Sequence, residues 1–471
     1  MTNHATPGRI RSTVEDVVRG TEGALVGGDL GVPVSGVSID SRTLDVGEVF
    51  FAIRGHRLDG HRFLQDAVAR GAACVVVDAV TDDLPASAAV VLVDDTTRAL
   101  GRFAAYHRSR FSVPVAAVTG SNGKTTTKEM MASVLGALGP VLKPEQSFNN
   151  QWGLPLTLLR LDTTHRAVAL ELGANQPGEI ATLARIARPT VGAVTVVANA
   201  HTEFFGSLDG VQAEKSALVQ AIDAEGAVVL NADDPRVLAM RDLARGRVLT
   251  FSARQPADVA ATGAVEERPE GLRFTLEVGG ARRSLSIGFA GRHNVTNALA
   301  AAGVGLACGL GVDQIVAGLE AARPVKGRCL WRRAGRLLVL DDTYNANPAS
   351  VTAALEAFGA GAAGHRRVVV LGDMLELGEI AERAHRDVGR AVATSGAAEF
   401  IAMGAYGRVS ADAARAMGLE ESHHTATFEE TVALLSKRLA PGDALLVKGS
   451  RGMRMERVVD AIIARFGGGD G

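Results

Sequence analysis

The sequence is poor in several features that mark large classes of protein. Only 4% of its 471 residues are aromatic, which leaves few side chains on which nucleic-acid bases could stack. Its 50 basic and 52 acidic residues nearly cancel and are interspersed, so no basic surface for nucleic acid or anionic lipid is indicated. We therefore expect no nucleic-acid partner.

Cysteine and long apolar runs are also scarce. Cys74, Cys308 and Cys329 follow no metal-binding or CxxC spacing, which predicts small core residues in a reducing compartment. The N-terminal segment lacks the apolar stretch of a secretory signal. The longest apolar run, residues 298–312, is broken by glycine and too short to cross a bilayer. We expect a cytoplasmic protein without membrane insertion, and a monomer.

The length favours about three domains, and the pattern divides the chain into three blocks. Residues 1–98 contain short strand-like runs and one helix, typical of a small α/β domain. Residues 99–324 alternate short apolar strands with helices, which predicts a parallel sheet covered on both faces. Residues 325–471 repeat that alternation and predict a doubly wound, Rossmann-like domain. The predicted fold class is therefore α/β with three domains.

A glycine-rich turn opens the second block. "VTGSNGKTTTKEM" follows a predicted strand and begins a helix, so backbone N–H groups and the helix N-terminus would face an anion. Lys124 would then reach the β- and γ-phosphates of a nucleotide, and Thr125 would hold Mg²⁺. The spacing is tighter than in the strict phosphate-loop pattern, because Val118 stands where the first glycine would fall. The motif predicts a nucleotide site and does not identify the reaction.

Polar residues follow other predicted strands of this block. Glu171 closes "AVALELGAN" and His201 closes "VGAVTVVANAH". Because active groups of parallel sheets gather beyond the carboxyl ends of strands, we expect both near the phosphate loop, with Glu171 as a second Mg²⁺ ligand. The turn "SFNNQWG" supplies Asn149 and Asn150, which are too polar for a core and fit a substrate or phosphate contact.

Lys215 interrupts the apolar face of the helix in "LDGVQAEKSALVQAI", a face that includes Val211 and Leu218. Glu214 lies at the edge of this face or outside it. One interpretation is a lysine that snorkels its ammonium to water. The other is that the helix starts at the rim that holds His201, so that Lys215 faces the phosphate site. Burial would lower its pKa, and a neutral amine can add carbon dioxide to form a carbamate, an anionic ligand for Mg²⁺. We expect the second.

Several motifs together resemble the Mur ligases, ATP-dependent amide-forming enzymes of peptidoglycan synthesis. In the second block the matching segments are "GSNGKTTT", "ELGAN", "ANAHTEFFGSL", "NADDP" and "GRHNVTNALAA". "DDTYNANP", "LGDMLELG" and "VKGSRGMRME" resemble the members that add D-alanyl-D-alanine to UDP-N-acetylmuramoyl-tripeptide (UDP-MurNAc-tripeptide). "SIDSRTLDVGEVFFAIRGHRLDGHRF" resembles their N-terminal UDP-substrate domain. The resemblance covers residues 37–459.

This resemblance implies ATP and Mg²⁺ as cofactors, an acyl-phosphate intermediate, and two small-molecule substrates, UDP-MurNAc-tripeptide and D-alanyl-D-alanine. Its implied catalytic residues are Lys124, Glu171, His201 and Lys215, the last as a carbamate. The implied metal ligands are Thr125, Glu171, His201 and Lys215. The implied ATP-binding residues are Thr119, Gly120, Ser121, Asn122, Gly123, Lys124, Thr125, Thr126, Asn294 (adenine), Arg328 and Asp342 (ribose). The implied substrate residues are Ser41, Arg42, Asp59, His61, Asn149, Asn150, Asn347, Lys448, Ser450 and Arg451.

Two alternatives remain at this stage. Another ligase of the same superfamily, such as the one that adds the third residue of the peptide or a folylpolyglutamate-type enzyme, would share the phosphate loop but not "DDTYNANP" with "LGDMLELG". A nucleotide-gated switch or transport ATPase would hydrolyse ATP without an acceptor. The pair Glu214–Lys215 also departs from the family's more frequent Ala-Lys-x-Glu order, which affects individual contacts and not the class.

Overall fold

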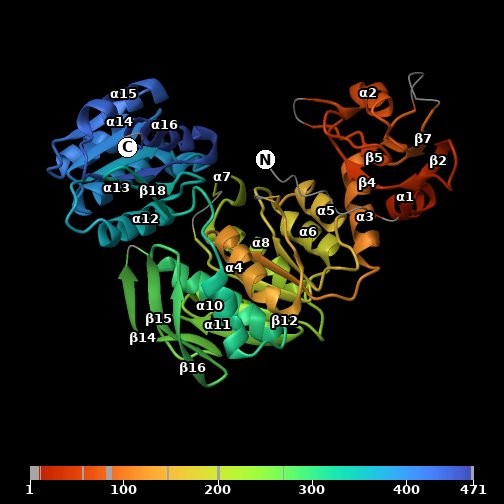
Figure 1. The fold of residues 1–471 in the computed structure, drawn as a ribbon, viewed down its shortest axis with the longest axis horizontal. Helices are drawn as coiled ribbons and strands as arrows, with labels where there is room; N and C mark the ends of the chain where they lie inside the picture. Colours follow the sequence, from red (N-terminus) through yellow and green to blue (C-terminus); the bar gives the residue numbers. More distant parts are fainter. Residues whose placement is uncertain are drawn as a thin grey trace.

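The computed structural model describes residues 10, 12–55, 58–80, 87–145, 148–198, 202–268 and 270–467. Three α/β parts follow one another along the chain, and the N-terminal and C-terminal parts lie on opposite sides of the central part (Figure 1). The predicted α/β fold class is confirmed. None of the helices in these described ranges is both long and apolar enough to cross a lipid bilayer.

The N-terminal part is built on a five-stranded sheet with the order β2-β7-β6-β5-β4. Its strands run parallel, apart from β2, which is antiparallel to β7. The elements are β1 (Ser12–Thr13), α1 (Val14–Thr21), β2 (Ala24–Gly27), β3 (Pro33–Val34), β4 (Gly36–Ser38), β5 (Glu48–Phe51), η1 (Gly60–Phe63), α2 (Leu64–Ala69), β6 (Cys74–Val77), β7 (Ala89–Leu92) and α3 (Thr96–Arg108).

Helix α3 joins this part to the next and packs against both. The Asp95 side chain begins the helix by accepting a hydrogen bond from the Arg98 backbone at 2.7 Å. On one side the Phe103 ring stacks on Phe51 of β5, with ring centroids 6.2 Å apart. On the other side the Thr97 hydroxyl accepts a hydrogen bond from the Trp152 indole of the central part. One hydrophobic core therefore runs through both parts.

The central part holds a nine-stranded sheet with the order β16-β15-β14-β13-β12-β11-β8-β10-β9. Its elements are β8 (Val115–Thr119), α4 (Lys124–Leu135), η2 (Gly136–Leu138), β9 (Val141–Leu142), α5 (Gly153–Leu158), β10 (Ala167–Glu171), α6 (Glu179–Ala187), β11 (Val191–Val194), α7 (Thr202–Phe205), α8 (Leu208–Gln220), β12 (Ala227–Asn231), α9 (Pro235–Leu238), η3 (Ala239–Leu243), β13 (Arg247–Ser252), β14 (Val259–Arg268), β15 (Gly271–Val278), β16 (Ala281–Ile287), α10 (His293–Ala307) and α11 (Val312–Ala321).

The strands from β9 to β14 run parallel, as predicted for this block. Residues 115–119 and 167–171 are buried throughout, because helices cover both faces of the sheet here. The sequence pattern did not predict the antiparallel extension formed by β15 and β16. Phe274 and Leu285 of this extension join the core, whereas its other face carries charged residues, so it lacks the continuous apolar run of the parallel strands.

The C-terminal part has a six-stranded sheet with the order β17-β18-β22-β19-β20-β21, parallel apart from the edge strand β17. Its elements are β17 (Leu330–Ala334), β18 (Leu337–Asp342), α12 (Pro348–Gly361), β19 (Arg367–Gly372), η4 (Gly378–Ile380), α13 (Ala381–Thr394), β20 (Glu399–Met403), α14 (Gly407–Ala416), β21 (Ser422–Thr425), α15 (Phe428–Arg438), β22 (Ala444–Lys448), η5 (Arg451–Met453) and α16 (Glu456–Phe466). Helices on both faces make this the predicted doubly wound arrangement (Figure 1).

Candidate active site

The glycine-rich turn connects β8 to α4 as the sequence predicts. Gly120 and Gly123 adopt φ angles of +144° and +83°, which favour glycine over other residues. A Cβ at Gly120 would overlap the Thr195 hydroxyl, and one at Gly123 would overlap the Asn297 side chain. No side chain caps the start of α4. The first N–H groups of the helix are therefore available for an anion.

The polar side chains of this loop and of the first turn of α4 are hydrogen-bonded or buried. The Lys124 ammonium donates to the Gly120 carbonyl at 2.8 Å, and burial lowers its pKa, with the nearby Arg328 acting in the same direction. Ser121 donates to the Ala198 carbonyl at 2.9 Å. The Thr119 hydroxyl is buried and donates to the Leu172 carbonyl, so this residue meets the turn through its backbone alone. Thr126 is also buried in the first turn of α4.

Thr125 and Glu171 meet at the carboxyl ends of β8 and β10. The Thr125 hydroxyl donates to Glu171 Oε2 at 2.8 Å, and Asn149 donates to Glu171 Oε1 at 2.7 Å. The two residues are neighbours because β8 and β10 pair directly. Asn150 instead accepts hydrogen bonds from the backbone of Trp152 and Gly153, which holds the turn before α5.

The linker to the C-terminal part sends Arg328 into this site. Its guanidinium donates to the Thr125 hydroxyl at 2.7 Å and lies 3.8 Å from the centre of the Tyr344 ring. Arg451 approaches the same ring at 5.5 Å. Tyr344 stands inside the "DDTYNANP" motif, but the sequence analysis gave it no role. Its position between Asp342 and Asn347, two residues predicted to bind ligands, was the sequence signal that could have indicated a role.

A second polar contact joins the two parts. The Asn347 amide donates to the Asn122 side chain of the phosphate loop at 2.8 Å. The oxygen of the same Asn347 side chain accepts from Ser350 and begins α12. The first turn of α12 is thus held against the phosphate loop.

Asp342, which is partly buried, and Lys448, which is buried, form an ion pair at the ends of β18 and β22. The Lys448 ammonium donates to Asp342 Oδ2 at 2.6 Å, and Asp342 Oδ1 accepts the Cys329 N–H at 3.0 Å. Ser450, two residues further on, accepts the Leu375 N–H at 2.8 Å. These three predicted residues therefore lie at one edge of the C-terminal sheet.

Asn294 is buried at the start of α10. Its amide donates to the Ala290 carbonyl at 2.7 Å, and its oxygen accepts from Asn297 at 2.8 Å. Asn297 in turn accepts from the Thr127 hydroxyl. This chain of contacts links α10 to α4, and the i, i+3 spacing of the two asparagines is the sequence signal that could have indicated it.

Lys215 is 3% exposed, in the middle of α8. A snorkelling lysine would keep its ammonium in water, so its burial contradicts that interpretation. The ammonium lies 5.6 Å from the centre of the Phe205 ring, and burial, with the charge of Lys124 second, lowers the Lys215 pKa to about 7. The electrostatic influence of Lys124 indicates that Lys215 lies near the phosphate loop.

Glu214, which the periodicity places at the edge of the apolar face of α8 or outside it, is buried in the structure. Its carboxylate is 7% exposed and accepts the N–H groups of Gly178 and Ile180, both at 2.7 Å. These two donors belong to the N-terminus of α6, where the N-cap residue itself provides no side-chain cap. Helix α8 therefore packs against a partner on this side as well. Helical periodicity alone does not distinguish a solvent-facing carboxylate from one that caps a neighbouring helix.

His201, predicted as a metal ligand, lies outside the described residues. Ser41, Arg42, Asp59 and His61 all belong to the N-terminal part. Arg42 is exposed and pairs with Asp40 at 2.7 Å, whereas His61 Nδ1 lies 2.7 Å from Asp59. In the described hydrogen bonds none of these four side chains contacts the phosphate loop.

Three family models match the chain in order. They are described as "Mur ligase family, catalytic domain" (residues 33–108), "Mur ligase middle domain" (118–305) and "Mur ligase, glutamate ligase domain" (327–451). Each match overlaps one of the three α/β parts of the chain.

Known proteins agree with these matches. A UDP-N-acetylmuramoyl-tripeptide–D-alanyl-D-alanine ligase of Mycobacterium tuberculosis is 37% identical, over 91% of this chain and 92% of the relative. A MurF crystal structure from Acinetobacter baumannii is 32% identical with a TM-score of 0.89, and covers 97% of this chain and 100% of its own. MurF ligase from Thermotoga maritima, solved in complex with ADP, is 27% identical with a TM-score of 0.80, over 92% and 97% of the two chains.

Proposed function

Because this chain belongs to the Mur ligase family, we propose that it joins D-alanyl-D-alanine to the terminal carboxylate of UDP-MurNAc-tripeptide at the expense of ATP. The relatives that match nearly its whole length are named for this reaction. The observation that carries the proposal is the meeting of Thr125, Glu171 and Arg328 beside the open phosphate loop. We place the reaction in the cytoplasm, and the three free cysteines fit a reducing compartment.

The reaction requires that a carboxylate, a poor electrophile, be activated. The tripeptide carboxylate attacks the γ-phosphorus of ATP, giving an acyl phosphate and ADP. The dipeptide amine then attacks the acyl carbon, loses a proton, and the tetrahedral intermediate expels phosphate. Lys124, Arg328 and the N-terminus of α4 neutralise the charge that develops on the phosphate oxygens. Closure of the C-terminal part over the loop excludes the water that would hydrolyse the acyl phosphate.

The oxygen atoms near the loop suit Mg²⁺. The Thr125 hydroxyl and the Glu171 carboxylate lie 2.8 Å apart and could share one ion. The described part of the chain has no group of three or more His, Cys, Asp or Glu side chains that could hold a metal ion by itself, so phosphate and water would complete the coordination of an ion here. When bound, Mg²⁺ would polarise the phosphate oxygens. Thr125 and Glu171 would hold it there.

We also propose that Lys215 is carbamylated. Its burial and lowered pKa favour the neutral amine, which adds carbon dioxide and releases one proton. The resulting anion would relieve the repulsion between the Lys215 and Lys124 ammonium groups. As an oxygen ligand it would serve Mg²⁺ together with His201.

Three domains, residues 1–98, 99–324 and 325–471, share the work of the reaction. The first holds the UDP end of the substrate through Ser41, Arg42, Asp59 and His61. The second holds ATP. The third supplies Arg328, Asp342 and the loop after β22 to the reacting groups. We expect Asn149, Asn347 and Arg451 to contact substrate between them.

A product assay tests this function. Purified protein is incubated with UDP-MurNAc-tripeptide, ATP, Mg²⁺ and D-alanyl-D-alanine, and the products are analysed by mass spectrometry. We expect UDP-MurNAc-pentapeptide, with ADP and phosphate released only when both peptide substrates are present. Lys124→Ala serves as the inactive control. Equal turnover with D-alanine as acceptor would contradict the dipeptide specificity, and strong ATP hydrolysis without acceptor would favour the switch or transport alternative.

A further inference from the structure

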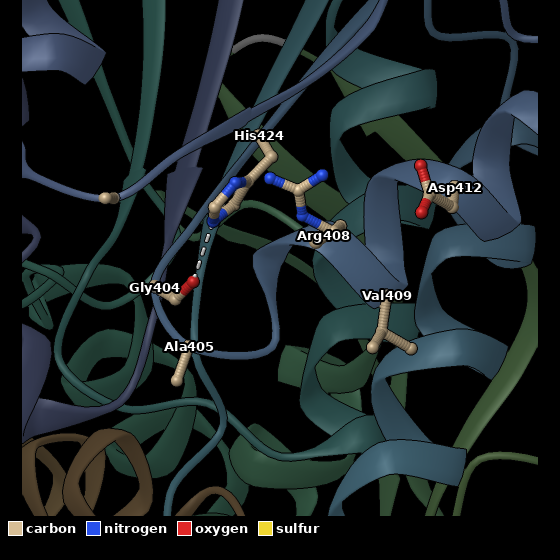
Figure 2. A pocket seen from close by; sticks show the side chains of 7 residues that line it. Gly404, Ala405, Arg408, Val409, Asp412 and His424 are labelled. Atoms are coloured by element: carbon tan, nitrogen blue, oxygen red, sulfur yellow. Dashed lines mark hydrogen bonds between the residues drawn. The ribbon is translucent and has the colours of Figure 1, made fainter.

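A cavity of about 560 Å³ lies beside the carboxyl ends of β20 and β21 in the C-terminal part. Its walls come from the loop after β20, from the first half of α14, and from β21 with the residues that follow it (Figure 2). A space of this size is typical of small-molecule sites. None of the residues that line it carries a function predicted from the sequence.

One positive charge in this cavity has no partner. The exposed Arg408 guanidinium forms no hydrogen bond or ion pair with any described residue. The acidic residue of the lining, Asp412, is already paired with Arg415 at 2.7 Å. Figure 2 shows the Arg408 and His424 side chains directed toward the same space. The cavity therefore favours an anionic ligand.

The remaining walls are small and apolar. Ala405, Val409 and Ala426 contribute only methyl groups. His424 donates its Nε2–H to the Gly404 carbonyl at 3.0 Å, which fixes the ring at the cavity wall. The ligand that fits this lining carries an anionic group beside short aliphatic groups.

The loop that leads from β20 into α14, the helix that carries Arg408, is held in place by a residue that follows the neighbouring strand. Asp373, directly after β19, accepts the N–H groups of Ala405 at 2.7 Å and Tyr406 at 3.1 Å. A Cβ at Gly404, whose φ is +118°, would overlap this carboxylate. At Gly407 a Cβ would lie 2.7 Å from the His424 ring. The two glycines thus permit the close packing that positions the cavity.

The same contacts continue toward the predicted reaction site. The Ser450 N–H, after β22, donates to the Asp373 carbonyl at 3.1 Å. Because β19 lies between β22 and β20, and β21 follows β20, the cavity is two to three strand spacings from β22, or about 10–14 Å. An extended dipeptide spans about 7 Å, and the arginine side chain covers the remaining distance. A dipeptide whose amine lies near Ser450 can therefore present its carboxylate to Arg408.

The geometry points to this cavity as the subsite for the terminal carboxylate of the acceptor dipeptide, an inference that rests on the proposed function. Arg408 pairs with the carboxylate. Ala405, Val409 and Ala426 pack against the alanyl methyl groups. Arg408 is thus a residue that determines the acceptor's specificity and takes no part in the transfer of phosphate.

The test compares two acceptors, D-alanyl-D-alanine and D-alanyl-D-alaninamide, which lacks the negative charge. Steady-state ligation by the full chain gives KM for each acceptor, for ATP and for UDP-MurNAc-tripeptide. We expect the unaltered chain to have a KM at least about tenfold higher for the amide, as for the loss of a charge-assisted hydrogen bond. Arg408→Ala should raise the KM for the dipeptide by about the same factor and leave the other three values unchanged. Arg408→Lys should retain part of the preference.

Two further variants complete the test. Arg383→Ala removes an exposed arginine of α13 outside the cavity and should change nothing. Ala426→Asp adds a negative charge to the cavity and should raise KM for the dipeptide but not for the amide. Full preference for the dipeptide in Arg408→Ala, or an equal loss with both acceptors, overturns the inference. If the unaltered chain ligates neither acceptor, the proposed function itself fails, which is a separate and recognisable result.

Discussion

An aromatic ring orients the arginine that crosses from the C-terminal part to the phosphate loop. The Arg328 guanidinium is 3.8 Å from the Tyr344 ring centre, and its Nε has no hydrogen-bond partner among the described residues. Its contact with Thr125 comes from Nη2 alone. A long side chain held by one hydrogen bond would sample several rotamers, so the ring fixes its direction.

Tyr344→Leu should therefore weaken the use of ATP. We expect kcat/KM for ATP to fall by between about twofold and thirtyfold, the range of a cation–π contact, with KM for the UDP substrate unchanged. Tyr344→Phe keeps the ring and should retain the activity of the unaltered chain. Steady-state kinetics at varied ATP measures both variants. A Leu variant as active as the Phe variant would show that the ring is not needed to position Arg328.

Lys215 gives a second prediction for a single residue. Lys215→Ala should lower kcat by at least about 100-fold, because an anionic group at the phosphate site is lost. The far-UV circular dichroism spectrum should be unchanged, and the thermal unfolding midpoint should not fall, because the side chain removed is a buried amine. Short carboxylic acids added to the variant should restore part of the rate. Full activity in Lys215→Ala would assign this lysine to packing alone.

At the scale of elements, the sequence predicted the strands of the central sheet that are buried on both faces. The strands at residues 115–119 and 167–171 are apolar up to their last residue, and the loop after the first needs two glycines with positive φ. A functional site whose residues lie in one short segment, such as the phosphate loop, could therefore be predicted from the sequence. The partners of Glu214 and Tyr344 were not, because these contacts join residues far apart in the sequence. Local periodicity does not indicate that the N-terminus of α6 will lie beside Glu214, or that an arginine will lie beside Tyr344.

Helix α13 places a neutral histidine under the loop that follows β19. His385 Nε2 accepts the Met374 N–H at 2.9 Å, so the ring carries its proton on Nδ1 and donates it to the Ala381 carbonyl. The ring stacks on Tyr406, and the Asp373 carboxylate lies 3.8 Å away. Burial lowers the His385 pKa despite this carboxylate. The folded chain therefore resists a proton that the unfolded chain accepts.

It follows that the C-terminal part should lose stability in mild acid. As pH falls below about 6.5, the unfolded state binds a proton at this histidine before the folded state does. His385 contributes at most about 1.4 kcal/mol of lost stability per pH unit, until the pH reaches its folded pKa. Urea unfolding at pH 7.5 and 5.5, followed by Trp331 fluorescence, measures the loss. His385→Gln should reduce the difference between the two pH values, and an unchanged difference would contradict the assignment.

For the whole molecule, the three α/β parts do not correspond to three separate cores. Phe103 of α3 belongs to a cluster that includes Phe51 of the N-terminal part and Leu170 of the central part. The C-terminal part buries two clusters, around Phe400 and Leu445, and in the described residues only Ala290 of the central part joins the first of them. Its described polar contacts with the phosphate loop and α4 are those of Asn347 and Arg328. Interfaces of this polar kind permit relative movement, whereas a shared core does not.

The N-terminal and central parts should consequently unfold together, and the C-terminal part separately. The chain has two tryptophans, Trp152 beside α3 and Trp331 stacked near Phe358, so the variants Trp152→Phe and Trp331→Phe each leave one reporter. Urea titrations of the two should give different midpoints. Phe103→Ala, which costs about 3–5 kcal/mol, should shift only the Trp152 transition, and Phe400→Ala only that of Trp331. If each substitution shifted both transitions equally, the chain would be one cooperative unit, and movement of the C-terminal part would require more than the breaking of its polar contacts.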